Sequence, residues 1–166
     1  MEVLLVRHAI AAERDPGRWP DDALRPLTDE GRARFRPAAR GLAALVAAPA
    51  RVLASPYART WETAAILAEE TGWPAPERCS ALAAHHGAGD ALHALADAEG
   101  AGPLVLVGHE PTMTLLTRLL VRAEDEPGVD WFRKGAAALV AFDGLPAAGA
   151  GRLVWQRQPR ELRALG

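Results

Sequence analysis

The chain contains little sulfur and almost no lysine. Cys79 is its only cysteine, and Lys134 is the only lysine among 19 basic residues. A single cysteine excludes intramolecular disulfides and cysteine-rich metal sites, so we expect Cys79 to be a small buried hydrophobic residue. The sequence also lacks an apolar run of about 20 residues that could span a bilayer, and it has no signal-type amino terminus. We therefore expect a cytoplasmic protein with no membrane partner.

The charges of the chain almost balance. A formal net charge of −2 gives no general attraction to nucleic acid or to an acidic membrane, so any anion site must be local. A length of 166 residues with 49% hydrophobic content is typical of one domain with one core. We expect a single domain over residues 1–166, of a size and charge compatible with a monomer.

Short apolar runs alternate with longer helix-like segments. The expected strands cover residues 3–6, 52–54, 104–107, 138–142 and 153–155, and the expected helices cover residues 29–47, 56–71, 90–99 and 111–122. This alternation predicts parallel strands joined by crossover helices, hence a three-layer α/β/α sandwich with a mostly parallel central sheet. The last two runs are too close for a crossover helix, so they predict an antiparallel C-terminal hairpin.

Residues at the segment ends support these boundaries. Thr28 is suited to cap the first helix, and Gly72 is suited to end the second. Ser55 followed by Pro56 is typical of a helix cap with proline at the first helical position, and Ser55 lacks the flanking glycines of a hydrolase nucleophile. Pro37 lies inside the first helix, where it predicts either a kink or a break.

Three of the expected strands end in basic residues. Arg7 and His8 follow the first strand, Arg59 lies a few residues after the second, and His109 follows the third. Ligands of open α/β sheets bind outside the carboxyl ends of the strands, so these four side chains are expected to meet in one crevice. Two arginines and two histidines form a coherent site for phosphoryl transfer, which depends on positioning and on charge stabilisation.

Each residue type suits a distinct task at such a site. One imidazole must be neutral at the nitrogen that attacks phosphorus, with its tautomer held by a partner on the other nitrogen. The arginines can hold phosphoryl oxygens bidentately, and a second, protonated histidine can donate to another oxygen. A phosphate ion is therefore an expected occupant of the pocket, also favoured by the helix that begins near Pro111.

The order and spacing of these residues resemble a known family. Residues 7–9, RHA, resemble the RHG/RHA signature of the histidine phosphatase superfamily, whose fold is phosphoglycerate mutase-like. Residues 55–64, SPYARTWETA, resemble its SPxxRxxxTA segment, and residues 108–111, GHEP, resemble its late GHxP segment. The segments RPLT at 25–28 and WQ at 155–156 narrow the resemblance to short bacterial SixA-type phosphohistidine phosphatases.

The resemblance implies that His8 is the phosphorylated nucleophile and that Arg7, Arg59 and His109 form the phosphate pocket. It implies a phosphatase without metal or organic cofactor, acting on phosphohistidine in a protein. A broad small-molecule phosphomonoesterase and a non-catalytic module that binds a phosphorylated side chain are the alternatives. Both imidazoles are present, and a mere anion site would not need a neutral nucleophile.

The general acid is not evident from the sequence. Larger family members carry a carboxylate before the late histidine, where this chain is short, and Glu13 and Asp90 are the nearest candidates. An imidazole leaving group has a conjugate acid with a pKa of about 6.5, so weak acid assistance suffices for phosphohistidine. The short chain also leaves less material for a lid, which favours a protein substrate over a small phosphorylated molecule.

Other histidines and the lysine have less defined roles. His85, His86 and His93 lie close in sequence, but no cysteine or carboxylate cluster completes a zinc site. We expect them at the surface or the pocket rim, where His86 can contact substrate. Lys134 can reach an anion from the start of the hairpin, although a solvated lysine is the more common role.

Overall fold

A six-stranded sheet forms the centre of the computed structural model, which describes residues 1–96 and 102–166. The strands are β1 (Glu2–Arg7), β2 (Arg51–Ala54), β3 (Glu77–Arg78), β4 (Leu104–Gly108), β5 (Ala137–Ala141) and β6 (Arg152–Arg157). They lie in the order β3-β2-β4-β1-β5-β6. The first four are mutually parallel, and β5 is antiparallel to both β1 and β6. The expected mixed sheet with a C-terminal hairpin is confirmed.

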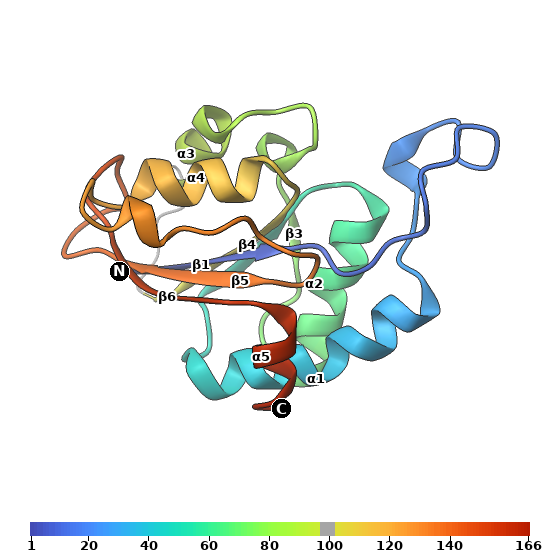
Figure 1. Ribbon diagram of the computed structural model, residues 1–166, viewed down its shortest axis with the longest axis horizontal. Coiled ribbons are helices and arrows are strands. Elements are labelled where there is room, and N and C mark those ends of the chain that lie inside the picture. Colours follow the sequence, from blue (N-terminus) through green and yellow to red (C-terminus); the bar gives the residue numbers. More distant parts are fainter. Residues whose placement is uncertain (97–101) are drawn as a thin grey trace.

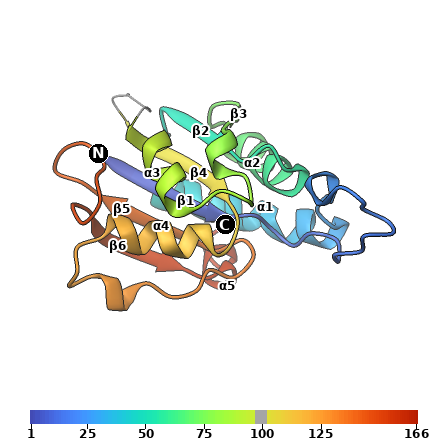
Figure 2. The same ribbon diagram turned by 90° about the horizontal axis from the view of Figure 1, so that it is seen from above.

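Helices cover both faces of this sheet (Figures 1 and 2). They are α1 (Asp29–Leu45), α2 (Ala58–Thr71), α3 (Ala88–Ala96), α4 (Thr112–Leu120) and α5 (Pro159–Arg163), with 3-10 turns η1 (Asp22–Leu24), η2 (Ser80–Leu82) and η3 (Glu126–Gly128). In Figure 1, α3 and α4 lie above the sheet and α1 and α5 lie below it, and α2 packs on the same core as α1. This arrangement confirms the three-layer α/β/α sandwich. No helix in the described residues is long and apolar enough to cross a membrane.

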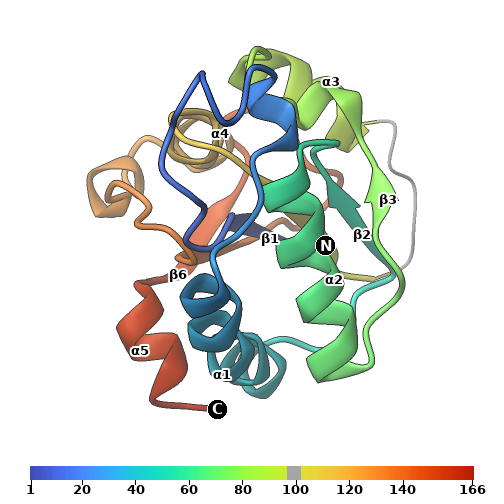
Figure 3. The ribbon, with the colours of Figure 1, turned by 90° about the vertical axis from the view of Figure 1, so that its right-hand side faces the viewer.

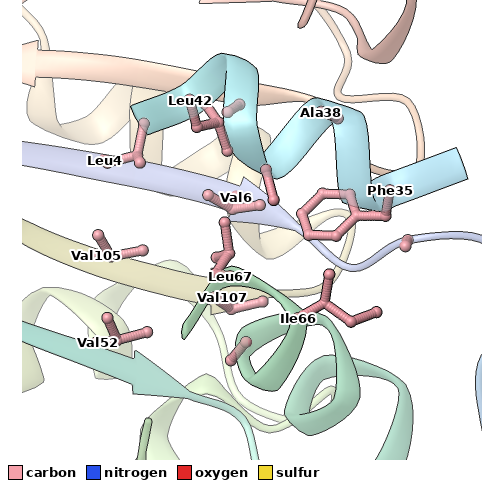
Figure 4. Packing of buried hydrophobic residues seen from close by; sticks show 14 of the residues in the cluster. Leu4, Val6, Phe35, Ala38, Leu42, Val52, Ile66, Leu67, Val105 and Val107 are labelled. Atoms are coloured by element: carbon pink, nitrogen blue, oxygen red, sulfur yellow. The ribbon is translucent and has the colours of Figure 1, made fainter. Parts of the chain in front are cut away.

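Strand β1 is buried on both faces. Leu4 and Val6 belong to the core beneath α1 and α2, shown from close by in Figure 4. Val3 and Leu5 belong to the second core, under α3 and α4. None of these four side chains is exposed to solvent. A continuous apolar run therefore replaces the alternating pattern of a half-buried strand, as is usual for central parallel strands.

The helix ends agree in part with the sequence. The Thr28 hydroxyl accepts a hydrogen bond from the Gly31 N–H at 2.9 Å and caps α1, and Gly72 ends α2 in the left-handed conformation with φ 71°. The expected start of α2 at Pro56 is wrong, because Tyr57 is the capping residue and the helix begins at Ala58.

Helix α1 continues through Pro37, which excludes a break at this proline. A proline removes one backbone donor, and the buried neighbours Phe35 and Ala38 keep the helix packed on the core. Helices α3 and α4 also differ slightly in extent from the segments expected at 90–99 and 111–122. Positions 97–99 of the first of these lie outside the described residues.

Two short elements were not predicted from the sequence. Strand β3 pairs with the end of β2 over two residues, and α5 is a single turn that starts with a capping box between Gln158 and Glu161. Both are too short to produce a hydrophobic period. The expected burial of Cys79 is also not observed in full, because this residue sits next to exposed β3 and is only partly covered.

Gly31 allows the first turn of α1 to lie directly against the segment that follows β1. A Cβ at this position would overlap the carbonyl oxygen of Ile10, which accepts a backbone hydrogen bond from Thr28 at 3.0 Å. The obstacle to a Cβ at position 31 is backbone and not a flexible side chain. A larger residue at this position must therefore push α1 away from the sheet.

We expect Gly31→Ala to lower the free energy of unfolding by about 2 kcal/mol, because it overpacks a backbone contact. Urea denaturation measures the change. Gly89, in the first turn of α3, has open space at the Cβ position and is the matched control. Gly89→Ala should leave stability unchanged or raise it by up to about 1 kcal/mol through helix propensity. Equal effects of the two substitutions would contradict the close approach at Gly31.

Candidate active site

The carboxyl ends of β1, β2 and β4 lie together, and they carry the segments at residues 7–9, 55–64 and 108–111. The register pairs Arg7 of β1 with Gly108 of β4, so His8 and His109 are the next residues on neighbouring strands. The His8 N–H donates to the Gly108 carbonyl at 3.0 Å, and the Ser55 N–H donates to the Val107 carbonyl at 3.0 Å. Figure 3 looks onto this end of the sheet.

The structure brings the four expected side chains together. The rings of His8 and His109 meet edge to face, with 5.4 Å between their centroids. Arg59, from the first turn of α2, and Arg7 are both close enough to lower the pKa of His8 through their charge. His8, Arg59 and His109 are buried, at 5%, 3% and 3% exposure, so they form the floor of the site.

Unpaired donors gather at this floor. Among the described residues, the buried side-chain nitrogens without a hydrogen-bond partner are Arg7 Nε, Arg59 Nε and His109 Nδ1. Buried polar atoms in proteins are almost always paired, so such a cluster of donors indicates a site for a ligand that supplies acceptors. Two guanidinium groups and an imidazole suit an anion with several oxygens.

The tautomer of His8 is determined by its backbone. Nδ1 lies 2.7 Å from the carbonyl oxygen of Ala9, which can only accept, so Nδ1 carries the proton. The Ala9 N–H donates to the Thr63 hydroxyl at 3.0 Å, and that hydroxyl donates to the Arg59 carbonyl at 2.6 Å. The ring is thereby fixed to α2, and Nε2 retains its lone pair.

Burial keeps His8 neutral. Loss of solvent around the ring, and then the positive charges of Arg59 and Arg7, hold the pKa of His8 well below its usual range, although the Ala9 hydrogen bond opposes this. An uncharged imidazole with a fixed tautomer and a free Nε2 is chemically a nucleophile.

His109 is held by Ser55. Its Nε2 lies 2.9 Å from the Ser55 hydroxyl, which accepts from the Tyr57 N–H at 3.3 Å. When Ser55 donates to Nε2, the proton of the neutral ring lies on Nδ1, the atom without a partner. Burial, followed by the charge of Arg59, lowers the pKa of His109 to about 3. Ser55 thus orients an imidazole, and the expectation that it caps a helix is wrong because α2 starts three residues later.

Tyr57 lines the site. Its ring packs edge to face on His109 at 5.0 Å, and the Arg59 guanidinium lies 4.9 Å from the same ring. The ring of Trp61, further along α2, lies under the Arg78 guanidinium, 4.4 Å from the ring centroid.

Each arginine of the site has a carboxylate near it. Arg59 Nη1 donates to the Asp22 carbonyl at 2.8 Å, and its Nη2 lies 3.1 Å from Asp22 Oδ2. Arg7 Nη1 donates to the Phe132 carbonyl at 2.6 Å, and its charge stabilises the ionised form of Glu110. Burial nevertheless raises the pKa of Glu110 and outweighs the opposing effects of Thr114, Arg7 and Phe132.

Neither carboxylate was identified from the sequence. Glu110 directly follows His109 in the GHEP segment, and this adjacency is a signal that could have found it. Asp22 lies in a polar stretch without a recognisable pattern, so only the tertiary structure reveals its contact with Arg59.

Glu13 and Asp90, the acid candidates from the sequence, lie elsewhere. Glu13 is exposed and lines a cavity formed by residues 12–15 together with Arg18, Trp19 and Thr28. Asp90 accepts from the Gly87 N–H at 2.9 Å and lies 3.3 Å from His86 Nδ1.

The remaining histidines surround a neighbouring cavity. His86 and His93, with Asp90, line a hollow of about 490 Å³ between β3 and α3, to which neither the three floor residues nor Arg7 contribute. His85 stacks on His86, with ring centroids 4.4 Å apart. Within residues 1–96 and 102–166, no group of three or more potential ligands is placed to hold a metal ion. Lys134 is exposed, outside the floor of the site.

Comparison with known proteins identifies the family. The model of the histidine phosphatase superfamily (branch 1) matches residues 3–87. This chain belongs to that superfamily. An uncharacterized protein of Picosynechococcus is 37% identical over 115 residues, which cover 68% of each chain.

Solved structures extend the likeness over nearly the whole chain. The protein histidine phosphatase SixA complexed with tungstate is 28% identical, with a TM-score of 0.80 over 98% of this chain and 99% of that one. A putative SixA from Nakamurella is 25% identical, with a TM-score of 0.80 over 95% of each. A mycobacterial glucosyl-3-phosphoglycerate phosphatase with inorganic phosphate shares the fold, at 17% identity and a TM-score of 0.69 over 96% of this chain and 98% of that one. The resemblance seen in the sequence is confirmed.

The neutral histidines of this histidine phosphatase superfamily member make its stability depend on pH. The folded state lowers the pKa of His8 and His109, so below about pH 6.5 the unfolded chain binds more protons than the folded one. Stability from these rings is complete above that pH and declines as pH falls toward 3. We expect protonation linked to the His109 ring to remove about 2 kcal/mol of unfolding free energy between pH 7 and pH 5, and the His8 ring to act in the same direction, measured by urea denaturation.

A double variant, His8→Asn with His109→Asn, isolates this contribution from that of the carboxylates. Its stability should fall less steeply over the same pH interval. Parallel curves for the variant and the wild type would show that the two rings titrate normally in the folded protein.

Proposed function

We propose that this protein is a phosphohistidine phosphatase that transfers the phosphoryl group to His8 and then to water. The observation that supports it most is the combination at the floor of the site. A neutral imidazole with free Nε2 lies beside three buried, unpaired nitrogens of Arg7, Arg59 and His109. An anion-binding module would need only the donors, and the neutral nucleophile has no role in it.

In the first step, the lone pair of His8 Nε2 attacks phosphorus. The Nε2–P bond forms while the bond from phosphorus to the leaving nitrogen breaks, and that bond's electrons remain on the leaving nitrogen. The hydrogen bond from Nδ1 to the Ala9 carbonyl stabilises the positive charge that develops on the ring. Arg7, Arg59 and His109 hold the nonbridging oxygens, where the charge is spread.

In the second step, water attacks the phosphorus of phosphohistidine 8. The P–O bond forms, the P–Nε2 bond breaks, and its electrons return to Nε2, so the neutral ring is restored with its proton on Nδ1. Inorganic phosphate then leaves. Both displacements use the same donors, because the phosphoryl oxygens are held in the same pocket.

The chemistry of the leaving group supports phosphohistidine as the substrate class. Neither Glu13 nor Asp90 contacts the floor of the site, and Asp22 is ionised, because the hydrogen bond from Arg25 and the charge of Arg59 lower its pKa despite partial burial. An alkoxide needs a proton as it leaves, whereas imidazole departs as a neutral molecule from the protonated ring. The likeness to SixA, named as a protein histidine phosphatase, agrees with this assignment.

A rapid quench experiment tests the covalent step. After incubation with ³²P-labelled acetyl phosphate, the wild type should carry acid-labile, base-stable label, and His8→Ala should carry none, because no other neutral imidazole at the floor has its tautomer fixed for attack. His93→Ala is the matched control, since it removes a histidine outside the site and should retain the label. Label on His8→Ala, or an unlabelled wild type that still hydrolyses phosphohistidine, would refute the mechanism.

A further inference from the structure

The carboxylate of Asp22 covers the phosphate-binding arginine from outside. It lies in η1, within the long connection between β1 and α1 that crosses in front of the carboxyl ends of the strands in Figure 3. The Arg59 side chain is 4% exposed, whereas that of Asp22 is 31% exposed. Asp22 therefore stands between the buried guanidinium and solvent, at the mouth of the site.

One carboxylate offsets two arginines there. Asp22 Oδ2 lies 3.1 Å from Arg59 Nη2, and Oδ1 accepts from Arg25 Nε at 2.8 Å. Arg25 Nη1 also donates to the Ala12 carbonyl at 2.7 Å, which fixes this guanidinium beside the mouth. Without Asp22, an incoming substrate would meet the uncompensated charges of both Arg25 and Arg59.

The leaving group lies on the solvent side of the phosphoryl group, as Asp22 lies on the solvent side of Arg59. In-line displacement places the leaving atom on the side of phosphorus opposite the attacking Nε2. Because His8 lies at the buried floor, the opposite side faces the mouth. The charge of Asp22 also acts on the floor, since it opposes Arg59, Arg25 and Arg7 in their effect on the pKa of His109.

We propose that Asp22 is a specificity-determining residue, whose carboxylate at the mouth favours a neutral or cationic leaving group such as imidazole and repels an anionic one. The proposal rests on the phosphatase function proposed above and narrows its substrate class. Asp22 lowers the positive potential that Arg25 and Arg59 create at the mouth, so it disfavours an anionic leaving group relative to a neutral one. Asp22 thereby selects against phosphorylated metabolites that carry a carboxylate on the leaving group.

Substrates that differ in leaving-group charge test this role. Glycerol 3-phosphate and 3-phosphoglycerate have the same three-carbon skeleton, and only the second carries a carboxylate. We expect Asp22→Asn to lower the ratio of kcat/KM for glycerol 3-phosphate to kcat/KM for 3-phosphoglycerate by about 10-fold relative to the wild type. The same variant should lower kcat/KM for a phosphohistidine peptide and raise it for 3-phosphoglycerate.

Asp21→Asn is the matched control. Asp21 is the exposed neighbour in the same turn, and its side chain accepts from the Ala23 N–H at 2.9 Å without contact to Arg59. The substitution removes the same charge from the same loop and should leave the substrate ratio unchanged. An equal loss of kcat/KM for all three substrates in Asp22→Asn would overturn the proposal, because it would show that Asp22 only holds Arg59 in place.

The wild type alone provides a second test that needs no folded variant. Raising the salt concentration from about 0.02 M to about 0.5 M should narrow the ratio between the two glycerol-based substrates, because the mouth is partly exposed. A ratio that does not change with salt would overturn the role of charge. If His8 becomes labelled but the kcat/KM ratio of the two substrates is the same in Asp22→Asn as in the wild type, only the specificity proposal fails. If His8 is never labelled, the proposed function itself fails.

Discussion

The pairing of β1 with β4 is the interaction on which the rest of the site depends. Its register places Arg7 opposite Gly108, so the chain leaves both strands at the same level and His8 and His109 emerge side by side. The buried runs on both faces of these strands hold that register, because a slip of one residue would exchange the side chains of the two cores. The site is therefore as rigid as the centre of the sheet.

The electrostatics follow from placing cations at a buried floor. Burial disfavours the charged forms of His8 and His109, and the nearby arginines, which stay protonated, disfavour them further. The same charges that attract phosphate thus keep the attacking imidazole neutral. Asp22 and Glu110 offset part of this positive charge, each beside a different arginine. Their pKa values shift in opposite directions, because Asp22 has direct guanidinium partners whereas burial is the largest effect at Glu110.

Much of the fold could be predicted because local signals and tertiary packing agree. The β1 run, the Thr28 cap and the Gly72 terminus are encoded by adjacent residues, and the structure places each within a residue or two of its expected position. The exceptions have physical causes. Ser55 resembles a helix cap in sequence, but its hydroxyl binds His109, 54 positions away. Strand β3 exists only because β2 supplies its partner, since two residues are too few to show a hydrophobic periodicity in the sequence.

The sequence by itself determined the family, the order of the strands and helices, and the four basic residues at the strand ends, because each depends on residues close together in the chain. Only the tertiary structure decided which atom of His8 is free, which groups hold His109, and which carboxylates lie beside the arginines. Those features depend on contacts between distant segments, such as Asp22 with Arg59 and Arg7 with Phe132. The order of the residues alone does not show which of these groups lie within a few ångströms of one another.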